Sequence, residues 1–278
     1  MANSPSKPSV SAKSRAAAAQ AQRKKNNTTM YLVIGVVMVI GVALIVAIAS
    51  GGKDTTKKAT AGETVTILDK VTSVPAATYD AVGLGSVTAK PQPASGQALT
   101  KDGKPEILYI GAEFCPYCAA ERWGLATALA RFGTFTNVGV THSSGTDVFP
   151  NTATLTFHGS TYTSTYLAFT PIEAQTTDQK PLDPVTDEQQ KIWAALDPNQ
   201  SYPFIDFAGK FVISGASYDP GTLQGKTASE IADALADPTS TVAKGAIGTA
   251  NAMTAAICKL TKDQPAAVCS SKAVTALA

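Results

Sequence analysis

Histidine and cysteine are scarce in this chain, which has two histidines and four cysteines among 278 residues. Four cysteines are too few for a small domain held together by many disulfides, and a chain of this length can bury a substantial hydrophobic core. His142 and His158 have no evident partner in the sequence, which gives a Ser-His-Asp hydrolase triad little support. The four cysteines are therefore the main candidates for chemistry.

Acidic residues are absent from the first 29 positions, which carry six basic residues: Lys7, Lys13, Arg15, Arg23, Lys24 and Lys25. The rest of the chain holds 17 basic and 21 acidic residues, so it is mildly acidic although the formal net charge of the whole is +2. A mildly acidic globular part lacks the basic patch that nucleic acid requires. We therefore expect no nucleic-acid partner, and we expect residues 1–29 to form a disordered basic tail in the cytoplasm.

Charged residues are also absent between Lys25 and Lys53, and residues 30–49 form the apolar run MYLVIGVVMVIGVALIVAIA. At a rise of about 1.5 Å per residue, a run of this length spans the hydrocarbon core of a bilayer. Because a basic cluster precedes the run, the positive-inside rule predicts a single-pass anchor in the cell membrane with a cytoplasmic N-terminus. The alternative is a cleaved signal peptide, since Ala47-Ile48-Ala49 resembles a cleavage site. Both interpretations place the following residues outside the cytoplasm, where disulfides persist.

After the apolar run we expect a polar linker at residues 50–62 and one extracytoplasmic domain at residues 63–278. The apolar run EILYIGA at residues 106–112 predicts a buried strand, and the segment after it has helical spacing. A second strand is expected at Asn137–His142, in parallel with the first, and a weak strand at Thr64–Leu68. The alternation of polar and apolar residues predicts a hairpin at Thr154–Phe169 around Gly159.

Later in the domain, helix-start signals recur. Capping-box patterns at Thr186 with Gln189 and at Thr227 with Glu230 predict two helices. The segment YPFIDFAGKFVISG at residues 202–215 predicts two strands joined by a tight turn. A last helix is expected at about residues 242–260.

Cys115 and Cys118 lie in the string FCPYC, directly after the predicted buried strand. Pro116 suits the first turn of a helix, where its missing N–H costs nothing, so the two cysteines lie at a helix start. The Cys-x-x-Cys spacing lets the two sulfurs reach bonding distance, and the helix N-terminus stabilises the thiolate of Cys115. We therefore expect Cys115 to be the attacking thiol and Cys118 the resolving thiol that releases a mixed disulfide.

Other interpretations of this pair stay open, namely a permanent structural disulfide, an inactive scaffold, or a zinc site shared with Cys258 and Cys269. Zinc would require both pairs to converge, and the ten residues between Cys258 and Cys269 do not match a zinc knuckle. We expect no metal. The second pair is expected to form a structural disulfide worth ~3 kcal/mol in the chain-entropy model. Its alternative is a shuttle that exchanges electrons with the first pair.

Three residues beside the cysteines are candidate modulators: Glu113, Pro116 and Tyr117. Glu113 precedes Cys115 by two residues, where its carboxylate could relay a proton or raise the thiol pKa by like-charge repulsion. The alternative is that Glu113 is simply exposed. Trp123, five residues after Cys118, is expected to pack in the core.

The order of predicted elements resembles the thioredoxin fold. The strings GAEFCPYCAAERW and AICKLTKDQPAAVC together resemble an uncharacterised prokaryotic family of membrane-anchored thioredoxin-like proteins, over roughly residues 65–272. The centre CPYC is also similar to glutaredoxins and to periplasmic disulfide-bond oxidoreductases. The resemblance implies an α/β fold, a three-layer α/β/α domain that carries the hairpin as an insertion. It also implies that Pro203 is a cis proline facing the redox pair and that Tyr202 and Pro203 contact the substrate chain.

We therefore expect a membrane-anchored extracytoplasmic thiol-disulfide oxidoreductase that acts on cysteine-containing envelope or secreted proteins. No bound cofactor is expected, and a membrane dithiol protein is the expected redox partner. Strongly oxidising members of the superfamily carry a histidine between the cysteines, and Tyr117 near that position argues against a strongly oxidising potential. The alternative function is a non-catalytic thioredoxin-like binding module with a structural disulfide.

Overall fold

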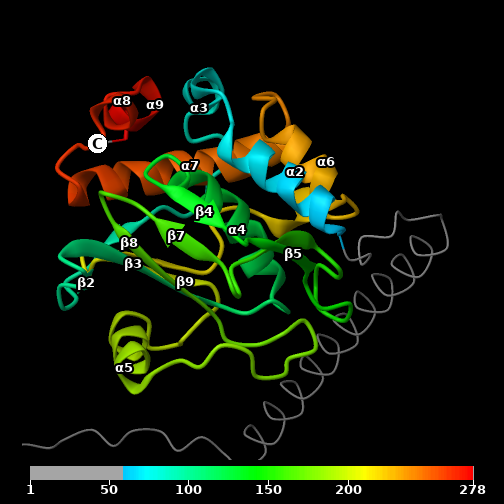
Figure 1. Ribbon diagram of the computed structural model, residues 1–278, viewed down its shortest axis with the longest axis horizontal. Helices are drawn as coiled ribbons and strands as arrows, with labels where there is room; N and C mark the ends of the chain where they lie inside the picture. Colours follow the sequence, from blue (N-terminus) through cyan, green and yellow to red (C-terminus); the bar gives the residue numbers. More distant parts are fainter. Residues whose placement is uncertain (1–58, 278) are drawn as a thin grey trace, which may run out of the picture. The chain divides into compact units, whose positions relative to one another are not determined.

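The computed structural model describes residues 59–277 (Figure 1). The predicted cytoplasmic tail (1–29), the predicted anchor (30–49) and most of the predicted linker lie outside this range. Within residues 59–277, no helix combines the length and the apolar character needed to cross a membrane. The described part is a mixed α/β structure with a mixed central sheet.

The central sheet is built around strand β3 (Lys104–Gly111), which is the buried strand that the sequence predicts. Its parallel neighbour is β8 (Ala168–Glu173), and its antiparallel neighbour is β9 (Phe204–Phe207). Strand β10 (Phe211–Ser214) pairs antiparallel with β9. Two short strands extend the sheet, with β1 (Gln92–Pro93) beside β10 and β2 beside the first residues of β3. Strand β2 covers Thr100–Lys101.

Side chains of β3 alternate between two hydrophobic cores on opposite faces of the sheet. Ile107 and Tyr109 belong to the larger core, and Leu108 and Ile110 belong to the smaller one. The larger core is covered by α4 and α7, whereas α5 covers the smaller core through Trp193. Figure 1 shows α5 on the opposite side of the sheet from α4 and α7. Their bounds are Pro116–Leu129 for α4, Asp187–Leu196 for α5 and Thr241–Leu260 for α7.

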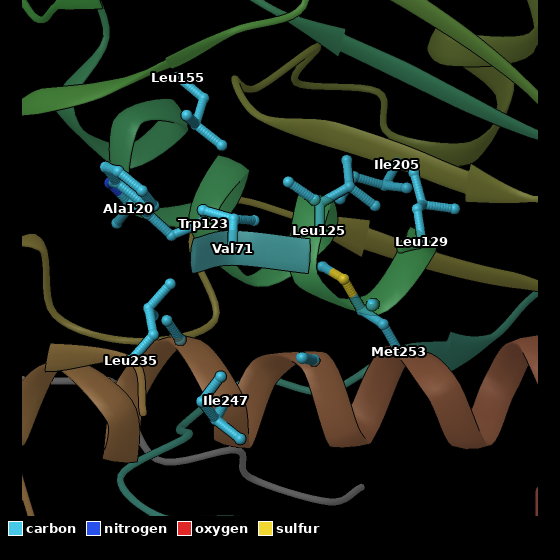
Figure 2. Packing of buried hydrophobic residues seen from close by; sticks show 14 of the residues in the cluster. Val71, Ala120, Trp123, Leu125, Leu129, Leu155, Ile205, Leu235, Ile247 and Met253 are labelled. Carbon is cyan, nitrogen blue, oxygen red and sulfur yellow. The ribbon is translucent and has the colours of Figure 1, made fainter. Parts of the chain in front are cut away.

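Helix α4 is buried along nearly its whole length because the sheet lies on one side of it and α7 on the other. Figure 2 shows Trp123, Leu125 and Leu129 of α4 in this packing, with Met253 of α7 directed toward them. Gly124 permits the close approach, since a Cβ at this position would lie 2.5 Å from Cγ2 of Thr249 in α7.

The N-terminal part of the described chain is helical and corrects one expectation. Helix α2 (Ala61–Thr72) occupies the segment Thr64–Leu68, where a weak strand was expected. Its buried residues Ile67 and Val71 are four positions apart, which is the spacing of one helix face. The remaining helical segments are α3 (Ala76–Val82), the 3-10 helix η1 (Pro220–Leu223), α6 (Ala228–Ala234), α8 (Ala266–Cys269) and α9 (Lys272–Thr275).

The segment Asn137–His142 does not pair with β3 as expected. Strand β5 (Gly139–His142) pairs antiparallel with β6 (Ala153–Thr156) in a separate two-stranded sheet. The parallel position beside β3 is occupied by β8. Local side-chain pattern indicates a strand but does not specify a distant partner, so the pairing could not be derived from the sequence.

The prediction of a hairpin at Thr154–Phe169 is also wrong. The chain does turn at Gly159, where φ is +71°. Strand β7 (Thr161–Thr163), after this turn, pairs with β4 (Thr134–Thr136) rather than with β6. Each arm of the expected hairpin therefore pairs with an earlier strand of the chain.

Both predicted capping boxes and the predicted tight turn are confirmed. At the start of α5, Thr186 Oγ1 accepts a hydrogen bond from the Gln189 N–H at 3.3 Å, and Gln189 Oε1 accepts one from the Thr186 N–H at 2.9 Å. The equivalent pair at Thr227 begins α6. The turn between β9 and β10 has Ala208 and Gly209 at φ of +54° and +71°.

Candidate functional site

Cys115 lies at the N-cap of α4, and Pro116 occupies the first turn, as the sequence predicts. The backbone N–H of Cys118 donates a hydrogen bond to Cys115 Sγ at 3.3 Å. Both cysteines are thiols. Cys115 retains 6% of its surface exposed, whereas Cys118 is fully buried. The two cysteines thus meet at a helix start, and only Cys115 keeps a small exposed surface.

The surroundings of the two thiols act on their pKa values in opposite directions. The hydrogen bond with the Cys118 side chain lowers the pKa of Cys115, and backbone N–H groups and the Arg122 guanidinium add to this effect against burial. Burial raises the pKa of Cys118, and its hydrogen bond with Cys115 raises it further. Cys115 is therefore the thiol that ionises first.

The cis proline implied by the thioredoxin resemblance is present, because the peptide bond between Tyr202 and Pro203 is cis. The Tyr202 ring makes an edge contact with Phe114, the residue before Cys115, at 6.2 Å between centroids. Burial raises the pKa of Tyr202, and both cysteines raise it further. The Tyr202 phenol therefore lies within electrostatic range of the thiols, and the structure brings these predicted residues together.

The candidate modulators Glu113 and Tyr117 have different surroundings. Glu113 is half-buried, and its backbone N–H donates to the carbonyl of Gln175 at 2.8 Å. Tyr117 is 40% exposed and makes an edge contact with Phe149 at 6.1 Å between centroids. Val148, in the same loop as Phe149, is 68% exposed. Tyr117, two residues after Cys115, thus contacts this loop through Phe149.

Sequence reasoning missed a buried ion pair behind the cysteines. Arg122 Nε and Nη2 donate to the two carboxylate oxygens of Glu173 at 2.8 and 2.5 Å. Both side chains are fully buried. The four-residue spacing from Cys118 to Arg122 is visible in the sequence, but Glu173 comes 51 residues after Arg122, at the end of β8. Only the parallel pairing of β3 with β8 brings the carboxylate to the helix.

A second buried carboxyl group, Glu121, was also missed. Its oxygens accept hydrogen bonds from the backbone N–H and the hydroxyl of Ser217, both at 2.7 Å. Burial raises the pKa of Glu121 to about 7, although the bonds from Ser217 oppose this rise. Glu121 therefore ties the loop that follows β10 to the helix that carries the cysteines.

His158 has a partner that the sequence did not reveal. Its Nδ1 lies 2.7 Å from Asp183 Oδ1, in a partly exposed pair. Across residues 59–277, no group of three or more histidine, cysteine, aspartate or glutamate side chains is arranged to hold a metal ion.

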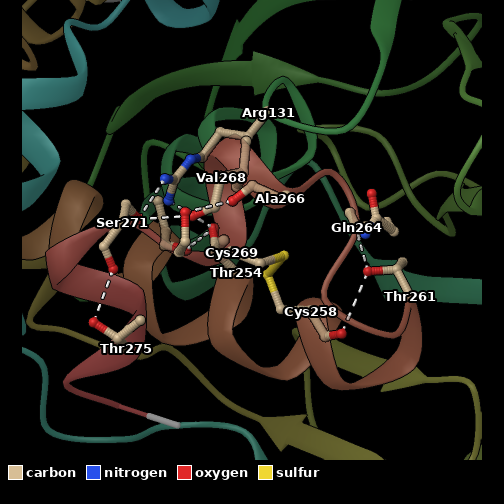
Figure 3. Close-up of a disulfide and its surroundings, with 12 residues drawn as sticks. Arg131, Thr254, Cys258, Thr261, Gln264, Ala266, Val268, Cys269, Ser271 and Thr275 are labelled. Carbon is tan, nitrogen blue, oxygen red and sulfur yellow. Dashed lines mark hydrogen bonds between the residues drawn. A yellow bond between two sulfur atoms is a disulfide. The ribbon is translucent and has the colours of Figure 1, made fainter.

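Cys258 and Cys269 form the predicted disulfide, which joins the end of α7 to α8 (Figure 3). Nearby, the Arg131 guanidinium donates to the hydroxyls of Thr254 and Ser271 at 3.2 and 3.3 Å. The disulfide and Arg131 thus attach the C-terminal helices to α7 and to the segment after α4.

The comparison with protein families shows to which family the chain belongs. The model of a family described as Domain of unknown function (DUF929) matches residues 90–259, more than half of the sequence. The chain belongs to this family. The match contains the Cys-x-x-Cys motif, Arg122, Glu173 and the cis proline, and it ends one residue after Cys258. Neither the curated proteins nor the solved structures contain a match. The expected membership of an uncharacterised family is confirmed, whereas the family description names no activity.

Proposed function

We propose that this DUF929 protein is a thiol-disulfide oxidoreductase of thioredoxin-like fold. The observation that carries the proposal is that the two thiols differ in exposure and in how readily they ionise. Cys115 lies at a helix N-cap, accepts a hydrogen bond from the Cys118 N–H, and keeps a small exposed surface. Cys118 is buried and harder to ionise. An attacking thiol needs the first environment, and a resolving thiol that acts only after a mixed disulfide has formed suits the second.

The order and direction of the strands support the thioredoxin-like part of the proposal. Strands β8, β3, β9 and β10 lie side by side in this order, and β9 runs antiparallel to the other three. The Cys-x-x-Cys helix follows β3, α5 connects β8 to β9 across the opposite face, and the cis proline precedes β9. These are the elements that the resemblance implies, and the paired strands β4–β7 and β5–β6 are additions between α4 and β8.

The proposed reaction is a two-step exchange. The Cys115 thiolate attacks one sulfur of a substrate disulfide, which forms a mixed disulfide and releases the other substrate sulfur as a thiolate that takes up a proton. Cys118 then loses its proton and attacks the Cys115 sulfur, which closes the Cys115–Cys118 disulfide and frees the second substrate thiol. Two electrons and two protons pass to the substrate, and a dithiol protein restores the pair. The same steps in reverse oxidise a substrate dithiol.

The proposed setting is the outer side of the cell membrane. The apolar run at residues 30–49, with its basic flank, supports an anchor. The Cys258–Cys269 disulfide supports an oxidising compartment. The proposed substrates are cysteine-containing envelope or secreted proteins, with a membrane dithiol protein as redox partner. Tyr117, Val148, Tyr202 and Pro203 are the proposed contacts for the substrate chain, and no cofactor takes part.

Single cysteine substitutions test this function. In the full-length chain, Cys115→Ser should abolish reduction of a model protein disulfide, because the attacking sulfur is lost. Cys118→Ser should instead accumulate mixed disulfides with other proteins in cells, visible on non-reducing gels, because no thiol resolves them.

The matched control replaces the other pair, Cys258→Ser with Cys269→Ser, and should retain turnover. Turnover that survives Cys115→Ser would contradict the proposal. Partner binding that persists in Cys115→Ser, together with no turnover in the unmodified protein, would instead support a non-catalytic binding module.

A further inference from the structure

A buried positive charge lies one helical turn after the cysteine pair. Arg122 follows Cys118 by four residues on α4, so the two side chains lie on the same side of the helix. The carbonyl of Ala112 accepts hydrogen bonds from Arg122 Nη2 at 2.8 Å and from the backbone N–H of Cys115 at 3.2 Å. A single carbonyl group therefore connects the guanidinium to the residue that bears the attacking thiol.

Glu173 holds the guanidinium in place but leaves one of its nitrogens unused. The carboxylate accepts two hydrogen bonds from Arg122 and one, at 3.2 Å, from the backbone N–H of Phe157. Burial raises the pKa of Glu173, and the Arg122 guanidinium and these hydrogen bonds oppose that rise by stabilising the carboxylate. Arg122 Nη1 has no hydrogen-bond partner among the described residues. The guanidinium is thus fixed in orientation, and its charge is only partly offset at the cysteines.

Several elements contribute polar groups around the two thiols. Tyr109 from β3, Arg122 from α4 and Tyr202 from the segment before β9 interact electrostatically with the thiols. Glu173 from β8 acts on Arg122, and Glu113 from the segment before α4 acts on Glu173. Arg122 is the cation in this set, and it lowers the pKa of both Cys115 and Cys118. Because the site is buried, water screens this charge little.

We propose that Arg122 is a positioning residue of the redox pair, a fixed buried cation that stabilises the thiolate form, and that Glu173 sets how strongly it does so. The inference rests on the proposed dithiol function and names the groups that tune it. A charge that stabilises the thiolate favours the reduced pair and makes its disulfide easier to reduce. The balance between Arg122 and Glu173 therefore sets the reduction potential.

The test compares two substitutions that have opposite electrostatic effects. Glu173→Gln removes the carboxylate that offsets Arg122, so alkylation of Cys115 by iodoacetamide should accelerate about three- to tenfold at a pH below the midpoint of the unmodified protein. The double variant Arg122→Met with Glu173→Gln removes both charges at similar volume, and alkylation should slow by a similar factor. The reduction potential against glutathione should rise in the first variant and fall in the second.

Conservative and distant substitutions separate charge from packing. Arg122→Lys keeps the cation and should keep the pH midpoint near that of the unmodified protein. Arg131→Met removes another partly buried cation, which bonds to Thr254 and Ser271, and should leave Cys115 alkylation unchanged. Shifts of the same sign in the two test variants, or slow alkylation in Arg122→Lys, would overturn the inference. If the double variant does not fold, alkylation of Glu173→Gln and Arg122→Lys still tests the role of Arg122.

These measurements need no substrate, so they separate the inference from the proposed function. Opposite shifts of the pH midpoint without turnover by the unmodified protein would sustain the role of Arg122 and refute the oxidoreductase. Turnover with unchanged midpoints would sustain the oxidoreductase and refute the role of Arg122.

Discussion

At the scale of single residues, Glu121 shows how burial changes a carboxyl group on α4, the helix that carries Cys118. Its pKa of about 7 lies above the ordinary value of 4.5. The folded protein therefore holds a proton on Glu121 at mildly acidic pH that the unfolded chain releases. The stability that this proton contributes is complete below about pH 4.5 and is lost as pH rises through about 7.

Replacing Glu121 with glutamine should remove this pH dependence, because glutamine does not titrate and can still bond to Ser217. Relative to the unmodified protein, the free energy of unfolding of Glu121→Gln should rise by about 2 kcal/mol between pH 5 and pH 8. Urea unfolding at the two pH values measures this difference. Glu188→Gln, at an exposed position of α5, is the matched control. A constant difference between Glu121→Gln and the unmodified protein across this range would contradict the expectation.

A residue of the site was predictable from the sequence when the residues it acts with lie close to it along the chain. Cys115, Pro116 and Cys118 were predictable because helix capping and Cys-x-x-Cys spacing are local features. The partners Arg122 and Glu173 were not, because an isolated arginine or glutamate carries no sign of burial until a strand from elsewhere covers it. The turn at Gly159 and both capping boxes were found for the same local reason as the cysteines.

At the scale of elements, the contact between α4 and α7 depends on the absence of a side chain at Gly124. Gly124→Ala would place a methyl group against Thr249, a buried and β-branched neighbour that cannot move aside. We expect the free energy of unfolding to fall by about 1 to 3 kcal/mol despite the better helix propensity of alanine.

Gly62 in α2 offers a matched control, since nothing lies within 4 Å of the Cβ that alanine would add there. Gly62→Ala should be stabilising by about 0.5 kcal/mol. Denaturant midpoints of the two variants should move in opposite directions. Equal stabilisation by Gly124→Ala and Gly62→Ala would show that α4 and α7 can move apart without a loss of stability.

The errors of sequence reasoning about elements are errors of pairing. The strands β5, β6 and β7 exist close to where the alternation of residues predicts them. Their partners differ from those expected, because a neighbour in sequence was assumed to be a neighbour in the sheet. The choice between β5 and β8 as the parallel partner of β3 depends on the packing of the whole domain.

At the scale of the whole molecule, the Cys258–Cys269 disulfide fastens the C-terminal helices. It closes a loop with a sequence separation of 11 residues. Replacing both cysteines with alanine should lower the free energy of unfolding by about 2 to 4 kcal/mol, since the unfolded chain regains the freedom of this loop. Denaturant unfolding of the full-length chain in detergent measures the loss, and an unchanged midpoint would contradict it. Turnover by the Cys115–Cys118 pair below the unfolding transition should persist.

The small exposure of Cys115 also has a consequence for the substrates of the proposed reaction. Only 6% of this residue is open to solvent, and Cys118 is not exposed at all. A flat, fully folded surface cannot bring a sulfur atom into line with so recessed a target, whereas a slender loop or a still-unfolded strand can. Under the proposed function, substrate cysteines on protruding or unfolded segments would therefore react faster than cysteines on flat folded surfaces.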